Sequence, residues 1–200
     1  ANKAISFDSD PDALEATLEG GAMTFISKST ASSSSTISFT SGIDSTYKEY
    51  MFIFKDIHPA TDGAEFQFQC STDSGSNYNT TITSSYFRAG HDEGDVSGQA
   101  KIVYETGHDL AQGTGFQTIG HDIGNDSDQQ YSGILNLFNP SSTTFVKHFI
   151  SVGNLVQQNN YSFNPYVAGY CNTTSAVDAV QFKFSSGNID AGTITLYGIN

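Results

Sequence analysis

Three Gly-His-Asp tripeptides are the first feature of this 200-residue sequence that could carry chemistry. They occupy residues 90–92, 107–109 and 120–122, and each places an imidazole next to a carboxylate. Zinc sites usually combine three or four His, Cys or Asp ligands, so three such pairs could form a metal centre if the fold brought them together. Gly, His and Asp are equally common at strand ends and in loops, where these tripeptides fall. Ordinary turns are therefore the favoured interpretation, and a metal site is the alternative.

The loop after the third tripeptide offers oxygen ligands at close spacing. Its sequence is HDIGNDSD, residues 121–128, and its oxygen-bearing side chains include Asp122, Asn125, Asp126 and Asp128. Calcium prefers several oxygen ligands of this kind. The same residue types also form hydrogen-bonded turns without any ion. We expect a turn rich in Asp and Asn, with calcium as the one cofactor that it could hold.

Motifs of the common enzyme classes are missing from the chain. It contains no GxSxG elbow, phosphate-binding loop, HExxH or GxGxxG. A glycosidase needs one carboxylic acid in apolar surroundings, but nearly all acidic residues here lie in polar loops, with Glu65 and Glu105 the exceptions. We therefore expect a protein that is not an enzyme.

Glycan binding is a separate function to weigh. Sugar sites stack rings on exposed aromatic side chains, and Trp offers the largest face. The chain has no Trp but ten Tyr, of which Tyr78 and Tyr131 lie near predicted loops. These two are candidates for a shallow glycan-facing site. The alternative is that they stand at strand ends with a buried ring and a solvated hydroxyl.

Composition excludes several kinds of partner. The formal net charge is −13, with only eight Lys and Arg, so the chain lacks the basic patch that nucleic acid or an anionic membrane requires. No run of apolar residues approaches the length of a membrane span. Charged residues make up only 14% of the sequence, whereas about 25% is usual, and Ser, Thr, Asn and Gly take their place. This composition favours strands and tight turns.

The N-terminal stretch DSDPDALEATLEGG, residues 8–21, has two interpretations. As an EF-hand loop it would use Asp8, Asp10, Asp12 and Glu19 as ligands. However, Ala13 stands where an EF-hand needs Gly, and Pro11 stiffens the loop. A short helix explains more of the residues.

That helix is expected over about residues 11–19. Asp10 is a good N-cap, Pro11 suits the first helical position, and the glycines at 20–21 end the helix. We expect residues 1–28 to form an arm and residues 29–200 the main domain. The arm either folds back on its own domain or docks on a neighbouring subunit. Its partner-binding side chains would be Ile5, Phe7, Leu14 and Leu18.

The rest of the chain has the pattern of an antiparallel β-sandwich. About a dozen short apolar runs are separated by Gly, Ser, Asn, Asp or Pro. In AEFQFQC (64–70), AVQFKF (179–184) and GTITLYGI (192–199), apolar and polar residues alternate. One face of each strand is therefore expected to be buried and the other solvated, which is typical of antiparallel sheets packed face to face.

Turn residues and cysteines add two local expectations. The segment TDSGSN (72–77) is predicted to be a hairpin loop, and SSGNIDAG (185–192) to join the last two strands. Cys70 and Cys171 both lie in apolar strand-like runs. Two buried free thiols are the favoured interpretation, and a single cross-link closing a long loop is the alternative.

A family resemblance enters at ISFTSGIDSTYKEYMFIFKDIHPATDGAEFQFQCSTDSGSNYN (37–79). With residues 135–151 and 167–199, this stretch resembles a β-sandwich module in virion proteins of tailed bacteriophages, especially from marine samples. The resemblance covers about residues 22–199 and rests on several moderately specific segments. It implies a non-enzymatic structural protein of the virion, assembled in the host cytoplasm. No catalytic residues come with it.

We therefore expect a jelly-roll-like sandwich that serves as a capsid decoration or head-fibre subunit. Its partners would be major capsid or tail proteins and further copies of itself. Modules of this kind often end a longer fibre chain, whereas here only some twenty residues precede the module. A short arm fits an accessory subunit better than a long tail fibre. A tail-fibre or receptor-binding module that recognises host glycans is the alternative.

Overall fold

The computed structural model describes residues 22–96, 98 and 100–200, which form an all-β structure without helices. The helix expected over about residues 11–19, and the four apolar arm residues, lie outside the described part. The arm boundary predicted at residue 28 falls inside the first strand. The strands are β1 (Met23–Thr30), β2 (Ile37–Phe39), β3 (Glu49–Pro59), β4 (Ala64–Ser71), β5 (Ile82–Asp92), β6 (Lys101–Tyr104), β7 (Gln117–Ile123), β8 (Tyr131–Phe138), β9 (Lys147–Gln157), β10 (Tyr161–Cys171), β11 (Ala179–Phe184) and β12 (Ile189–Ile199).

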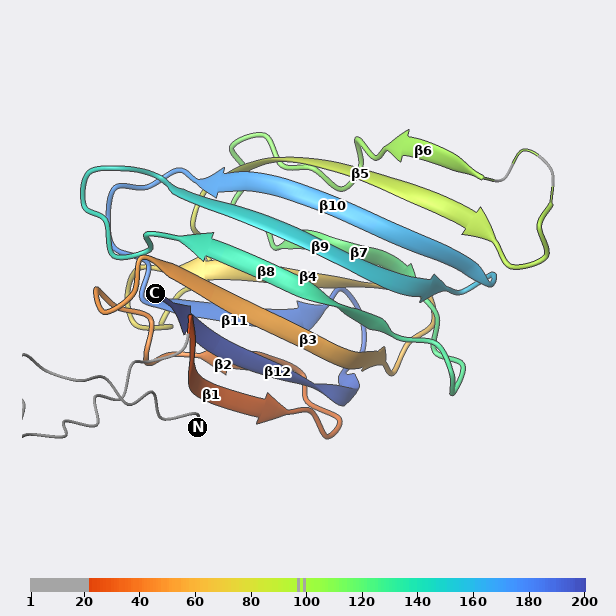
Figure 1. Ribbon diagram of the computed structural model, residues 1–200, viewed down its shortest axis with the longest axis horizontal. Helices are drawn as coiled ribbons and strands as arrows, with labels where there is room; N and C mark the ends of the chain where they lie inside the picture. The colour runs from red at the N-terminus through yellow and green to blue at the C-terminus, as the bar shows by residue number, and fades with distance from the viewer. Residues whose placement is uncertain (1–21, 97, 99) are drawn as a thin grey trace, which may run out of the picture.

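These strands make one antiparallel, nearly closed sheet that folds back on itself into two layers. The larger layer has the order β6-β5-β10-β9-β8-β3-β12-β1, and the smaller has the order β7-β4-β11-β2. A single residue pair, Ile123 with Gln157, links β7 to β9 and joins the layers along one side. On the other side a bridge pairs Ser34 with Ile189. In Figure 1 the larger layer runs from β6 at the top to β1 at the bottom, in front of the smaller one.

Aromatic side chains fill the space between the layers. The predicted buried face of β4 and β11 is confirmed, because Phe66, Phe68 and Phe182 are all fully buried. The opposite face of β4 is not fully solvated as predicted, since Gln69 is buried as well. Phe182 of the smaller layer meets Phe54 of the larger one with ring centroids 5.1 Å apart. Phe68 and Phe149 make a similar edge-to-face contact at 4.9 Å. Each such pair adds about 0.5–1.5 kcal/mol beyond the burial of its area.

The two predicted strand connections differ from simple hairpins. The loop 72–77 joins β4 to β5, which lie in different layers and do not pair. Its turn is held instead by Asp73, whose carboxylate accepts hydrogen bonds from the backbone N–H and the side-chain amide of Asn77. The segment 185–192 likewise leads from β11 in one layer to β12 in the other. The hairpin prediction for 72–77 is therefore wrong, because turn residues set the local bend and do not choose the pairing partner.

Candidate functional site

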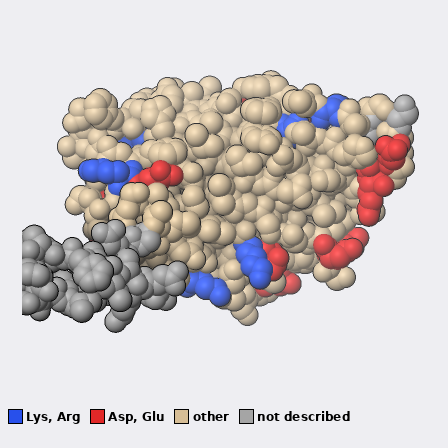
Figure 2. All heavy atoms as spheres, viewed as in Figure 1, with Lys and Arg blue, Asp and Glu red and all other residues tan. Residues whose placement is uncertain are grey.

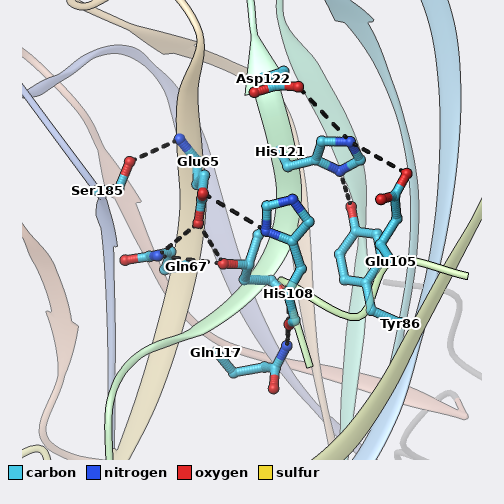
Figure 3. Close-up of polar contacts among 10 residues, drawn as sticks. Glu65, Gln67, Tyr86, Glu105, His108, Gln117, His121, Asp122 and Ser185 are labelled. Atoms are coloured by element: carbon cyan, nitrogen blue, oxygen red, sulfur yellow. Dashed lines mark hydrogen bonds and ion pairs between the residues drawn. The ribbon is translucent and has the colours of Figure 1, made fainter. Parts of the chain in front are cut away.

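Two of the three Gly-His-Asp tripeptides meet inside the molecule. The rings of His108, in the β6–β7 connection, and His121, on β7, stack with centroids 4.5 Å apart and planes 22° from parallel. The connection is anchored by Gln117, whose side-chain amide donates to the carbonyl of His108 at 2.9 Å. Figure 3 shows the polar side chains that surround the two imidazoles.

His121 is held by a tyrosine and faces two carboxylates. Its Nδ1 lies 2.8 Å from Tyr86 Oη, and its Nε2 lies 4.0 Å from carboxylate oxygens of Glu105 and Asp122. Burial lowers the pKa of His121 to about 3, and the positive charges of His108 and Arg88 add to the effect. Burial also raises the pKa of Tyr86 well above its usual value. The phenol therefore keeps its proton and can donate it to Nδ1, which leaves the imidazole proton on Nε2, toward the carboxylates.

The carboxylates around the two imidazoles have partners of their own. Glu105 Oε1 lies 2.7 Å from Arg88 Nε, and the Arg88 guanidinium sits 3.7 Å from the centre of the Phe163 ring. Glu65 Oε2 accepts hydrogen bonds from Thr118 Oγ1 at 2.7 Å and from the Gln67 side chain at 3.0 Å. The other oxygen, Oε1, lies 3.6 Å from His108 Nδ1.

This cluster is suited to holding the layers together more than to catalysis. His121 is only 3% exposed, and its Nδ1 already has a buried partner, so a substrate cannot reach that nitrogen without local opening. Across residues 22–96, 98 and 100–200, no group of three or more His, Cys, Asp or Glu side chains is arranged to hold a metal ion. The cluster links β5 and β10 of the larger layer to β7 of the smaller one.

Sequence patterns pointed to part of this cluster. His108 and His121 belong to two of the Gly-His-Asp tripeptides. Glu65 and Glu105 are the two acidic residues that were predicted to lie outside polar loops. Tyr86 and Arg88 were missed, because their side chains point inward from β5 and no local motif marks that direction. The first tripeptide, residues 90–92, is separate: His91 is half exposed at the end of β5, with its Nε2 3.5 Å from Asp95.

The predicted calcium residues are spread over β7 and the β7–β8 turn. Asp122 lies on β7, whereas Asn125 packs in the turn through a hydrogen bond from its backbone N–H to Asp62. The backbone carbonyl of Asp126 accepts a hydrogen bond from Gln129 N, as in an ordinary turn. Asp128 lines two surface hollows. This geometry adds nothing in favour of calcium, which stays a prediction.

Of the two predicted glycan-facing tyrosines, Tyr131 is inside the core. It is fully buried on β8 and packs against Phe54 and Phe66. That prediction was wrong, because the inward direction of Tyr131 follows from strand pairing that the loop position did not reveal. Tyr78 is half-buried, and its hydroxyl is turned inward, away from solvent.

The end of β5 and the β7–β8 turn meet at a hollow of about 270 Å³. His91, Asp92 and Glu93 come from the end of β5, and Asp128 and Gln129 from the β7–β8 turn. The β9–β10 turn closes the hollow with Asn160 and Tyr161. Carboxylates, amides and one aromatic ring thus border a single surface depression.

The fold defines an antiparallel all-β protein with two facing layers. Comparisons with protein-family models, curated proteins and solved structures found no match. Within the described residues, no helix is long and apolar enough to cross a membrane.

Proposed function

We propose that this chain is a structural subunit of a tailed-bacteriophage particle, of the capsid decoration or head-fibre type, built on a jelly roll. The observation that carries the proposal is the strand order. Eight strands, taken along the chain, are β1, β2, β3, β4, β7, β8, β11 and β12. In the larger layer, strands one, eight, three and six of this series are neighbours, which are β1, β12, β3 and β8. Strands two, seven, four and five, which are β2, β11, β4 and β7, form the smaller layer.

This order supports the proposal, because a jelly roll is built from eight strands in two sheets and is common in viral capsid domains. The remaining strands are two inserted pairs, β5-β6 and β9-β10, which widen the larger layer. Because one fold hosts many functions, the strand order needs a second argument. The resemblance of residues 37–79, 135–151 and 167–199 to phage virion modules supplies it, and these stretches supply most of the jelly-roll strands.

The N-terminal arm is proposed as the attachment to neighbouring virion subunits. β1, which follows it, is an edge strand of the larger layer, with Met23 and Phe25 exposed by 42% and 59%. An unpaired strand edge with apolar side chains is a ready surface for another chain. Ile5, Phe7, Leu14 and Leu18 would supply the remaining apolar contacts.

Particle incorporation tests this proposal. Full-length chain and a variant lacking residues 2–21 would be supplied to assembling particles, with a Gly/Ser replacement of the same length as control. We expect the full chain in purified particles, and both altered chains folded by circular dichroism but absent from particles. Normal uptake of the truncated chain would contradict the arm, and absence of the full chain from particles would contradict the virion role.

Host-glycan recognition is a second candidate, favoured by the hollow at Glu93, Asp128 and Tyr161. A glycan array with the full chain tests it. Binding that is lost in Glu93→Gln and Asp128→Asn but kept in Glu49→Gln, which lies on β3 away from the hollow, would support recognition. An array without binding, or binding unchanged in both hollow variants, would exclude this site.

A further inference from the structure

The outer face of the larger layer carries most of the exposed apolar side chains of the described structure. Among the described residues, nine large apolar side chains are exposed, and seven of them lie on this face. The other two are Val96 and Phe145. The seven on the face are Met23, Phe25, Phe87, Ile102, Tyr104, Ile150 and Tyr166. A contiguous apolar patch of this kind marks an interaction surface.

Strand register aligns these side chains in rows that run across the layer. Residues directly opposite each other in antiparallel strands point to the same face. One row crosses all eight strands and consists of Tyr104, Phe87, Tyr166, Val152, Ile134, Ile53, Thr195 and Lys28. The next row crosses seven strands and consists of Ser85, Ala168, Ile150, Asn136, Met51, Tyr197 and Phe25.

The two rows contain a single charged residue, Lys28 on the edge strand β1, although the chain carries a net charge of −13. Figure 2, which looks onto this layer, shows a broad surface mostly free of Lys, Arg, Asp and Glu, with the charged groups mainly toward its rim. Phe87 and Tyr166 already stack on one another within the face, with centroids 5.2 Å apart and planes 6° from parallel. The middle of the face is therefore uncharged and rich in rigid aromatic rings, and its few charged residues lie toward β3 and β1.

We propose that this face is a two-fold interface between two copies of the chain. An apolar face with few charges is best matched by another apolar face with few charges. A second copy of the chain carries the same face, and a two-fold contact pairs identical surfaces. Two β-sheet faces pack at about 10 Å separation with strands about 30° apart. Two acidic copies that meet through faces with few acidic residues also keep most of their negative charges apart.

The size of the face agrees with a stable dimer. Eight strands about 4.8 Å apart span about 34 Å, and four rows of outward residues extend about 25 Å along the strands. The footprint is then about 800 Å² on each copy, which is the area that a specific interface of standard size buries per partner. This inference does not depend on the virion role, because it concerns the isolated chain.

Analytical ultracentrifugation of the full chain between 1 and 100 μM tests the proposal. We expect a species of about twice the 21.4 kDa chain mass, and tighter association as NaCl rises, because salt screens the repulsion between the acidic copies. Tyr166→Glu and Ile150→Glu should each weaken association at least tenfold. The matched control is Phe145→Glu, which changes an exposed apolar residue in the β8–β9 loop and should leave association unchanged.

Melting temperatures of the variants separate loss of contact from loss of fold. A folded wild-type chain that stays monomeric at 100 μM overturns the proposal, as does a dimer that Phe145→Glu breaks and Tyr166→Glu does not. A chain that dimerises only after residues 2–21 are removed also overturns it, because the arm would then occupy the face. A monomer that binds a polysaccharide through Tyr166 assigns the face to glycans instead.

Discussion

His108 and His121 stack ring on ring in the interior, 4.5 Å between centroids, with Glu65 beside one imidazole and Glu105 near the other. Thirteen residues separate them in the sequence, and a connection folded back from β6 to β7 brings them together. Protonation of His121 would place a positive charge in a buried site, directly beside the His108 ring. This relationship makes the protein sensitive to acid.

Stability is expected to fall as the pH decreases from 6.5 toward 3. In the unfolded chain His121 has an ordinary pKa of 6.5, whereas in the folded protein its pKa is about 3. Between these values the unfolded state binds a proton that the folded state does not, so acid favours unfolding. This pKa difference amounts to about 5 kcal/mol in the free energy of unfolding at the acid end.

Urea unfolding at several pH values measures this effect. His121→Gln should flatten the dependence between pH 6.5 and 4, while the exposed control His91→Gln should keep the wild-type slope. Equal slopes in wild type and His121→Gln would show that His121 is not the titrating group.

Removing the Tyr86 hydroxyl should destabilise the fold. Tyr86→Phe leaves His121 Nδ1 buried without its partner at 2.8 Å, at a cost of about 1–3 kcal/mol in the free energy of unfolding. Tyr166→Phe, on the exposed face, should change stability by less than about 0.5 kcal/mol. Chemical unfolding of both variants gives the comparison, and a smaller loss for Tyr86→Phe than for Tyr166→Phe would contradict the role of this hydrogen bond.

Lys147 should be among the most costly lysines to replace. It is fully buried on β9, and its ammonium donates to the carbonyls of Ser142, Phe145 and Thr173 at 2.6, 2.9 and 3.0 Å. Lys147→Met removes three charge-assisted hydrogen bonds to part-buried backbone carbonyls and should cost about 3 kcal/mol or more. The solvated control, Lys55→Met, should cost less than about 0.5 kcal/mol. Thermal melts of the two variants that shift equally would contradict the anchoring role.

The two cysteines should be unreactive in the native protein and reactive after unfolding. Cys70 and Cys171 are free and buried, and contact with Cys171 together with burial raises the pKa of the Cys70 thiol. Titration with a thiol reagent should therefore detect no rapid reaction in buffer, and two thiols per chain in guanidinium chloride without reductant. Zero thiols after unfolding would mean that the cysteines are joined by a disulfide, the alternative that the sequence left open.

Local patterns predicted the strands but not their partners. The alternation in AEFQFQC placed Phe66 and Phe68 correctly on one buried face, because side chains alternate along any extended backbone. The loop 72–77 was taken for a hairpin, yet the chain crosses there from one layer to the other. A turn sequence fixes a bend over a few residues, whereas pairing depends on contacts between strands distant in the sequence.

The same limit applies to the candidate sites. Tyr131 and Tyr166 are both strand tyrosines, but the first is fully buried and the second is exposed by 38%. Nothing in their neighbouring residues separates them, since the outcome depends on which face of each strand the opposite layer covers.

By itself the sequence determined an all-β chain of short antiparallel strands with an acidic, charge-poor composition, because these properties follow from local alternation, turn residues and residue counts. Only the tertiary structure decided the strand order, the joining of His108 with His121, and the collection of apolar side chains on one outer face. Each of these results from long-range pairing, in which one register choice sets the direction of every side chain along a strand.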